Sequence, residues 1–289
     1  MNKFGMKEAL DFMKRRWYRT LPNYYLFFII MLFFQWNIGE NNFWSFLFFT
    51  QNLFVKPIAG FYGVSWSLTI EEIFYVTFPF TLILIGFFVK KTNRKLLLTI
   101  AIFIIAPLAL RLIAYSGTEF SPGDYRKAAV IRLDSIAYGV LAAYLKIHFP
   151  IFWSKIQKQG LLTLLPFWYL FIYRGFPSLS IEHWNAVFFP LCSICMALTM
   201  PFFDSIKTNS SIFSKPISFI AEISYSLYLC HIPVIIIANR YFNIKHYLNG
   251  YALEFFYVIT IILFAYIVNR AWEKPMTKLR DKKSDQPRS

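Results

Sequence analysis

Charged residues are scarce in this chain of 289 residues, at 16% of the total, whereas soluble domains carry about 25%. Hydrophobic residues make up 57% and aromatic residues 21%, which excludes an ordinary soluble domain. Apolar runs near the length of a membrane span, about 20 residues, recur with only short polar breaks. The sequence therefore predicts an all-α polytopic membrane helix bundle with no room for a large soluble domain.

Acidic residues are half as numerous as basic ones, 15 against 30, so the net charge is +15. The Lys and Arg residues lie in the breaks between apolar runs, where they report orientation and contact anionic headgroups. This placement excludes nucleic acid as a partner and makes membrane lipids the partner of the basic residues.

Cysteine is also scarce, with three residues. Cys192 and Cys195 have redox or metal spacing, but no second Cys/His pair follows at a matching spacing, so we predict no metal site. The basic N-terminal segment runs straight into an apolar run without a signal-peptide cleavage site. No internal repeat supports the inverted-repeat architecture of many transporters.

Nine apolar runs are candidate spans. They lie at about 21–38, 43–58, 66–89, 96–114, 129–147, 160–174, 185–203, 217–238 and 251–269. If all nine crossed, the basic loop 90–95 would lie opposite the basic N-terminus, against the positive-inside rule. The short run 43–58 carries Gln51 and Asn52 in its middle, which suits a re-entrant or interfacial segment. We therefore expect about eight transmembrane helices plus this segment.

With eight spans, 22 of the 30 Lys and Arg residues fall on one side and 6 on the other. This bias predicts that both termini are cytoplasmic. Residues 1–20 then form a cytoplasmic amphipathic lead-in, and residues 276–289 form a basic cytoplasmic tail.

Two adjacent carboxylates, Glu71 and Glu72, lie inside an apolar run, where a charge is costly and often marks a functional site. On a helix Glu71 shares a face with Phe74 and Tyr75, whereas Glu72 points about 100° away. The alternative is a pair of protonated or snorkelling glutamates near a helix end.

Arg111, Arg132 and Asp134 place charges of both signs toward one side of neighbouring spans. They indicate either a polar substrate site or an ion-pair network that joins helices, since a buried charge needs a partner. His231 is the one histidine well inside a predicted span. It is either a catalytic base or a buried histidine with its hydrogen bonds satisfied.

Arg16 and Arg19 point the same way from a helix, because residues three apart are neighbours on its surface. A guanidinium pair at the cytoplasmic interface suits bidentate binding of phosphates. The alternative is a topology anchor at the end of a span.

Five motifs in this order resemble those of the acyltransferase-3 family of integral-membrane O-acyltransferases, over nearly the whole chain. They are Arg16-x-x-Arg19 followed by Pro22, Trp66-Ser-Leu-x-x-Glu71-Glu72-x-Phe-Tyr75 with Pro79, Arg132-Leu-Asp134 with Gly139, Ser224-Tyr-Ser-Leu-Tyr-Leu-Cys-His231, and Glu273-x-Pro275. The resemblance implies a membrane acyltransferase-like domain over 21–275, in the bacterial inner membrane. It also implies O-acylation, often O-acetylation, of a cell-envelope glycan such as lipopolysaccharide, with acyl-coenzyme A (acetyl-CoA) as donor.

The resemblance also implies roles for individual residues. Arg16 and Arg19 would bind the coenzyme phosphates, and Glu71 and His231 would be catalytic. The substrate-binding residues would be Tyr75, Arg132 and Asp134.

Family members usually have two further spans at the start, which carry an Arg and a His considered catalytic. We therefore expect a chain that is truncated and inactive alone. The alternatives are a non-enzymatic, degenerate family member and a membrane transporter.

Overall fold

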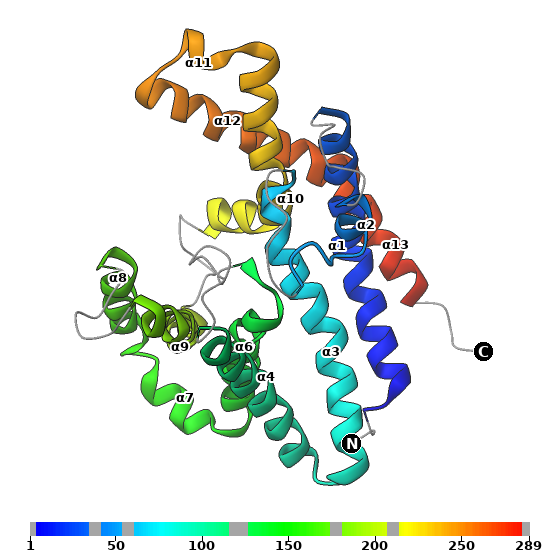
Figure 1. Cartoon of the computed structure of the whole chain (residues 1–289), viewed down its shortest axis with the longest axis vertical. Helices are drawn as coiled ribbons and strands as arrows, with labels where there is room; N and C mark the ends of the chain where they lie inside the picture. The colour runs from blue at the N-terminus through cyan, green and yellow to red at the C-terminus, as the bar shows by residue number, and fades with distance from the viewer. Residues whose placement is uncertain are drawn as a thin grey trace. The chain divides into compact units, whose positions relative to one another are not determined.

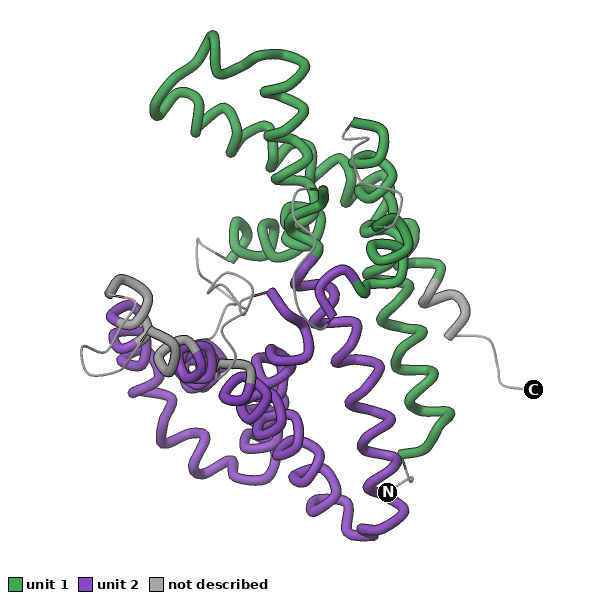
Figure 2. Tube along the Cα trace, viewed as in Figure 1, with its two compact units in different colours: residues 1–50, 58–65, 209–289 green, residues 51–57, 66–208 purple. Residues whose placement is uncertain are grey.

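The computed structural model describes residues 4–34, 42–53, 61–115, 127–173, 181–206 and 214–284. Every regular element in these ranges is helical (Figure 1), which confirms the predicted all-α helix bundle. The chain forms two compact units (Figure 2). The first unit comprises residues 1–50, 58–65 and 209–289, and the second comprises residues 51–57 and 66–208.

The first unit is built from two long helices and a C-terminal helical segment that pack together. Its elements are α1 (Met6–Phe34), α2 (Phe43–Leu47), η2 (Gly63–Ser65), α10 (Ser214–Phe242), α11 (Ile244–Tyr247), α12 (Gly250–Val268), the π-helix η5 (Asn269–Glu273) and α13 (Lys274–Ser284). Helix α1 buries Tyr24, Phe27, Phe28 and Met31, and it packs against α10 and α13. Helices α10 and α12 form a hairpin that α11 closes (Figure 1). Helix α1 is continuous across residues 20 and 21, where the lead-in was expected to end.

The second unit packs α3, α4, α6 and α9 around an aromatic core. Its elements are α3 (Trp66–Phe88), α4 (Thr92–Tyr115), η3 (Val130–Arg132), α6 (Asp134–His148), α7 (Pro150–Ile156), η4 (Gly160–Thr163), α8 (Leu164–Tyr173) and α9 (Ile181–Ser205). Ile70 and Phe74 of α3, Phe103 of α4 and Leu133 and Ala137 share one buried cluster. These contacts fix the beginning of α6 against α3 and α4.

Five helices of the described ranges are long and apolar enough to cross a membrane. They are Gly63–Phe88, Thr92–Ile113, Ala186–Ser205, Ser214–Phe242 and Gly250–Leu279. Val130–His148 and Pro150–Ile156 form a further apolar pair that is bent by 113°. The chain is therefore a multi-pass membrane protein, while the count of eight spans and the cytoplasmic termini stay predictions.

The segment expected not to cross is described as far as residue 53, and it holds only the five-residue helix α2 followed by turns. In the second unit its end runs beside the approach to η3. The amide nitrogen of Ala129 donates to the Asn52 carbonyl at 2.8 Å, and that of Val130 donates to the Leu53 carbonyl at 3.2 Å. The buried Asn52 side chain donates to the carbonyls of Trp66 and Lys127. These backbone carbonyls therefore accept hydrogen bonds from other parts of the protein. A non-helical segment inside a membrane needs such protein partners, because lipid offers none.

Candidate functional site

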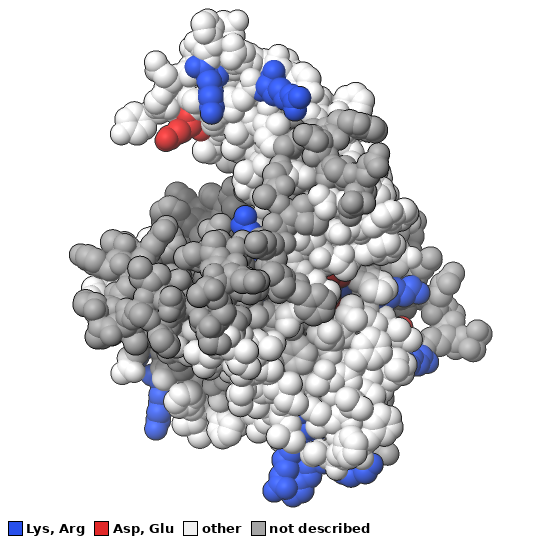
Figure 3. Space-filling view, viewed as in Figure 1, with Lys and Arg blue, Asp and Glu red and all other residues white. Residues whose placement is uncertain are grey.

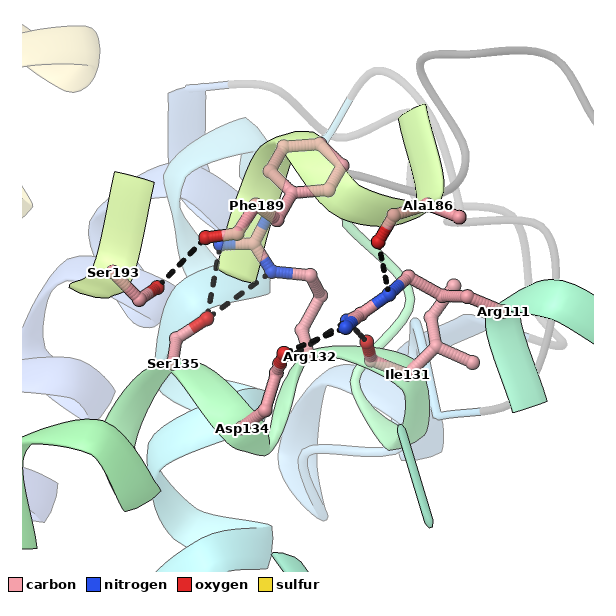
Figure 4. Close-up of polar contacts among 8 residues, drawn as sticks. All are labelled: Arg111, Ile131, Arg132, Asp134, Ser135, Ala186, Phe189 and Ser193. Carbon is pink, nitrogen blue, oxygen red and sulfur yellow. Dashed lines mark hydrogen bonds and ion pairs between the residues drawn. The ribbon is translucent and has the colours of Figure 1, made fainter. Parts of the chain in front are cut away.

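The second unit contains a fully buried ion pair between Arg111 of α4 and Asp134 of α6 (Figure 4). Arg111 Nη2 lies 2.6 Å from Asp134 Oδ2, and Nη1 lies 3.1 Å from Oδ1. The exposed fractions of the two side chains are 0% and 1%. Two parallel N–H···O bonds of this kind add geometric specificity to the charge attraction. The sequence left open whether these charges form a substrate site or an ion-pair network. Arg111 and Asp134 do form an ion pair that joins two helices.

The rest of the Arg111 guanidinium binds backbone carbonyls. Nε donates to the Ala186 carbonyl of α9 at 3.1 Å, and Nη1 also donates to the carbonyl of Ile131. The Ala186 carbonyl is available because Pro190, four residues later, has no N–H to offer it. A proline inside α9 thus supplies the acceptor that joins this helix to the buried arginine.

Arg132 has a different environment from its neighbour Asp134, although the two were expected to act together. Its Nε and Nη2 lie 3.3 and 3.1 Å from Ser135 Oγ. Its guanidinium carbon lies 3.9 Å from the centre of the Phe189 ring, a cation–π contact (Figure 4). Arg132 is only half-buried, so of the two it is the one that can reach a substrate.

The two glutamates of α3 differ in burial, as expected for residues 100° apart. Glu72 is buried, with 7% of its surface exposed, whereas Glu71 is half-buried. Tyr75 packs against the aromatic core of the second unit, with its ring perpendicular to that of Phe74 at 5.9 Å. Glu71 therefore has the more accessible carboxylate, and Tyr75 has a packing role whatever else it does.

His231 of α10 is half-buried in the first unit, and its Nδ1 lies 2.6 Å from the Tyr228 carbonyl oxygen. A carbonyl oxygen only accepts hydrogen bonds, so Nδ1 carries a proton, and in the neutral imidazole the lone pair is on Nε2. The Tyr228 hydroxyl in turn donates to the Val64 carbonyl at 2.8 Å. This arrangement leaves Nε2 as the nitrogen that can accept a proton.

A proline also shapes the helix around His231. Pro233 leaves the Leu229 carbonyl without its usual helical donor, and the buried Tyr62 hydroxyl donates to that carbonyl at 3.1 Å. Tyr62 could not be identified from the sequence, because it is far from α10 along the chain. The sequence signal for this contact is Pro233 itself. A proline inside a helix leaves one backbone carbonyl without its N–H donor, so another group has to donate to that carbonyl.

Arg16 and Arg19 lie on α1 in the first unit, Arg16 half-buried and Arg19 exposed. The next turn of α1 is fixed to other helices through its own carbonyls. The Tyr225 hydroxyl donates to the Thr20 carbonyl at 2.8 Å, and Trp272 Nε1 donates to the Pro22 carbonyl at 3.1 Å. The arginine pair therefore projects from a helix whose position is set by α10 and η5.

A polar cluster just beyond this turn contains Asn23, Ser226 and Glu273. Asn23 Nδ2 donates to Ser226 Oγ at 3.1 Å and to Glu273 Oε2 at 2.9 Å, and Ser226 Oγ donates to the same carboxylate oxygen at 2.5 Å. Asn23 and Ser226 are buried. Glu273 ends a π-helix, a form frequent at functional sites. Asn23 was not among the predicted site residues, because the sequence shows only a single amide side chain inside an apolar run.

The seven predicted site residues divide between the two units, and each set is described only within its own unit. Arg16, Arg19 and His231 belong to the first unit, and Glu71, Tyr75, Arg132 and Asp134 belong to the second. Within the described ranges, no three His, Cys, Asp or Glu side chains form a group that could hold a metal ion.

The model of the family described as the acyltransferase domain matches residues 2–270. The chain belongs to this family. It is 27% identical over 239 residues to the O-acetyltransferase OatA of Staphylococcus aureus strain NCTC 8325, a match that covers 75% of this chain and 36% of that protein. It is 30% identical over 237 residues to a putative O-acetyltransferase of Staphylococcus aureus strain COL, covering 74% of this chain and 36% of the relative.

The chain thus spans about a third of the length of the curated relatives that it matches. No solved structure matches it.

Proposed function

We propose that this chain is a membrane O-acyltransferase, specifically an O-acetyltransferase, that moves an acyl group from acyl-coenzyme A to a hydroxyl of a cell-envelope glycan. Membership of the acyltransferase family and similarity to two proteins named as O-acetyltransferases support the reaction class. The observation that carries the proposal is the hydrogen bond from His231 Nδ1 to the Tyr228 carbonyl. It leaves at Nε2 the lone pair that a general base needs.

The reaction then follows from ordinary acyl-transfer chemistry. His231 Nε2 takes the proton of the acceptor hydroxyl while the hydroxyl oxygen attacks the thioester carbonyl. The carbon–sulfur bond breaks, the coenzyme leaves as a thiolate, and the imidazolium returns the proton to that sulfur. Glu71 is the second residue to which we assign a catalytic role, that of a hydrogen-bond acceptor.

Two arginines of α1 are the proposed coenzyme site. Positions three apart on a helix lie about 60° apart around its axis, so Arg16 and Arg19 can approach one phosphate-bearing ligand from one side. A planar guanidinium binds two phosphate oxygens at once. We place this site on the cytoplasmic side of the bacterial inner membrane, where the coenzyme is found and where the basic residues concentrate.

Three residues of the second unit form the proposed acceptor region. Arg132 is the half-buried cation beside the Phe189 ring, and it suits hydrogen bonding to sugar hydroxyls. Asp134 contributes to this acceptor region indirectly. Its carboxylate forms an ion pair with Arg111, so it holds the start of α6 in place and does not contact the acceptor. Tyr75 completes the region from α3, on the same unit.

The test is acetyl transfer by the full chain in proteoliposomes, with radiolabelled acetyl-CoA and a cell-envelope glycan fraction as acceptor. We expect His231→Gln to lower the rate by about 10²- to 10⁴-fold, the usual contribution of a general base. His246→Gln is the matched control, because His246 is exposed on α11. Equal rates for the two variants would refute the role of His231. No transfer by the unmodified chain would refute activity of this chain alone and would agree with the expectation that it is inactive alone.

A further inference from the structure

A groove of the first unit runs along the hairpin of α10 and α12 beside α1. Its volume is about 340 Å³, and Thr260 is the one polar residue among the ten that line it. Val234 and Ala238 of α10 form one wall, Phe256 of α12 forms the other, and Ile30 of α1 contributes from the side.

The order of the lining residues along the antiparallel helices α10 and α12 defines two ends of the groove. Phe264 lines one end, with its ring centre 6.3 Å from that of Phe27. Phe242 and Ile244 line the other end, on either side of Asn243, whose left-handed backbone (φ 47°) follows α10.

The length of the groove matches one leaflet of a bilayer. The lining residues Pro233 and Phe242 are nine positions apart on α10, which corresponds to about 14 Å of helix at 1.5 Å per residue. The hydrocarbon core of a bilayer is about 30 Å thick. The groove is therefore about as long as the depth that one lipid chain occupies in one leaflet.

Exposed basic residues are close in the sequence to the lining residues Phe242 and Ile244. Arg240 lies two residues before Phe242, and Lys245 directly follows Ile244. Arg240 Nη1 lies 3.4 Å from the Phe34 carbonyl at the end of α1, the helix that also contributes to the groove. Basic side chains are visible on the surface of this hairpin (Figure 3).

Helices α10 and α12 carry two acidic residues, Glu222 and Glu254. Glu222 forms an ion pair with Lys274. Glu254 is six positions before Thr260 on α12, which places it about 120° around the helix from that lining position. Neither acidic residue lines the groove.

We propose that this groove binds one acyl chain of an anionic phospholipid, with the lipid phosphate at Arg240 and Lys245. The apolar lining takes the chain, because burying apolar surface is favourable and no polar partner is required. The two basic side chains select the headgroup, since Arg and Lys form charge-assisted hydrogen bonds with phosphate oxygens. This inference does not depend on the proposed transferase activity.

The experiment uses the full chain in nanodiscs that contain phosphatidylglycerol with a photoactivatable diazirine in one acyl chain. After illumination, mass spectrometry maps the labelled peptides. We expect label on the α10 and α12 peptides that carry Ala238 and Phe256. Unlabelled phosphatidylglycerol should compete for this site at least tenfold better than unlabelled phosphatidylcholine.

Two kinds of variant separate the headgroup site from the chain site. Arg240→Gln with Lys245→Gln should reduce the label about tenfold and remove the preference for the anionic competitor. Ala238→Trp should reduce it by filling the groove. Lys90→Gln with Lys91→Gln is the matched control, because it removes two exposed lysines beyond the end of α3 and should leave the label unchanged.

Equal competition by the two lipids would overturn the proposal, because the groove would then hold ordinary bilayer lipid. Label spread evenly over the apolar surface of α3, α4 and α12 would overturn it as well. If Ala238→Trp fails to fold, as judged by gel filtration, the charge variants alone still decide the outcome.

Discussion

Replacing the partners of the Arg111–Asp134 pair tests whether Asp134 acts on a substrate or on the fold. Asp134→Asn keeps the shape of the side chain but leaves the Arg111 charge without its counterion at a site where both side chains are at most 1% exposed. Arg111→Met leaves a carboxylate at the same site without the arginine.

The structure sets the expected size of each effect. Removing one partner of a buried ion pair destabilises a protein by about 3–5 kcal/mol. Asp134→Asn should lie toward the lower end, because Arg111 keeps the carbonyls of Ala186 and Ile131 as acceptors. Arg111→Met should lie toward the upper end, because it also leaves the Ala186 carbonyl, deprived of a helical donor by Pro190, without a partner.

The assay is the free energy of unfolding in mixed micelles, measured by titration with a denaturing detergent and followed by circular dichroism. The double variant Arg111→Met with Asp134→Leu should be at least as stable as Arg111→Met alone. Both variants leave the carbonyls without the guanidinium, but only the single variant buries a carboxylate without a counterion. Acetyl transfer per folded molecule is measured on the same samples.

Two results would refute this reasoning. Additive losses in the double variant would show that Arg111 and Asp134 do not stabilise the fold as a pair. A normal unfolding free energy for Asp134→Asn, together with a raised KM for the acceptor, would show that Asp134 contacts the substrate directly.

Three further predictions concern topology, the coenzyme and packing. In a chain without native cysteines, Thr92→Cys should react with an impermeant thiol reagent only from the cytoplasm and Thr118→Cys only from outside; labelling of position 92 from outside would refute the predicted topology. Lysine at Arg16 and Arg19 should keep the charge but weaken acyl-coenzyme A binding in a filtration assay, and unchanged binding would leave these residues as topology anchors only. Gly160→Ala should lower the unfolding free energy by about 1–3 kcal/mol, because the added Cβ would lie 2.9 Å from a backbone oxygen of α9.

The helical class and the positions of the five long apolar helices could be predicted from the sequence, because burial in a bilayer requires continuous apolar helices. The division near residue 21 into a lead-in and a membrane domain stays a prediction. Helix α1 joins a polar N-terminal half to an apolar half without a break, and hydropathy changes along a helix do not require the helix to end. The bend of 113° between α6 and α7 was not predicted, although Pro150 at the start of α7 is the kind of residue that marks such a break.

The candidate site was predicted less evenly, because adjacent residues acquire partners from different helices. Arg132 and Asp134 are two positions apart in one motif, yet one lies against Phe189 of α9 and the other binds Arg111 of α4. The sequence placed both residues near one end of a predicted span, and the structure has them at the η3–α6 junction. It could not give their partners, which depend on how α4 and α9 pack against α6.

Prolines inside helices offer a way to recover part of that information from sequence. Pro190 and Pro233 each remove a donor from a carbonyl four residues earlier, and in both cases a side chain distant in the sequence supplies it, Arg111 in one and Tyr62 in the other. In a membrane such a carbonyl is satisfied by neighbouring helices, Ser or Thr side chains, ordered water or local helix adjustments. At Pro190 and Pro233 the donor is a buried side chain from elsewhere in the same unit. The same reasoning makes Tyr62 and Arg111 structurally necessary where a search for catalytic motifs would pass over them.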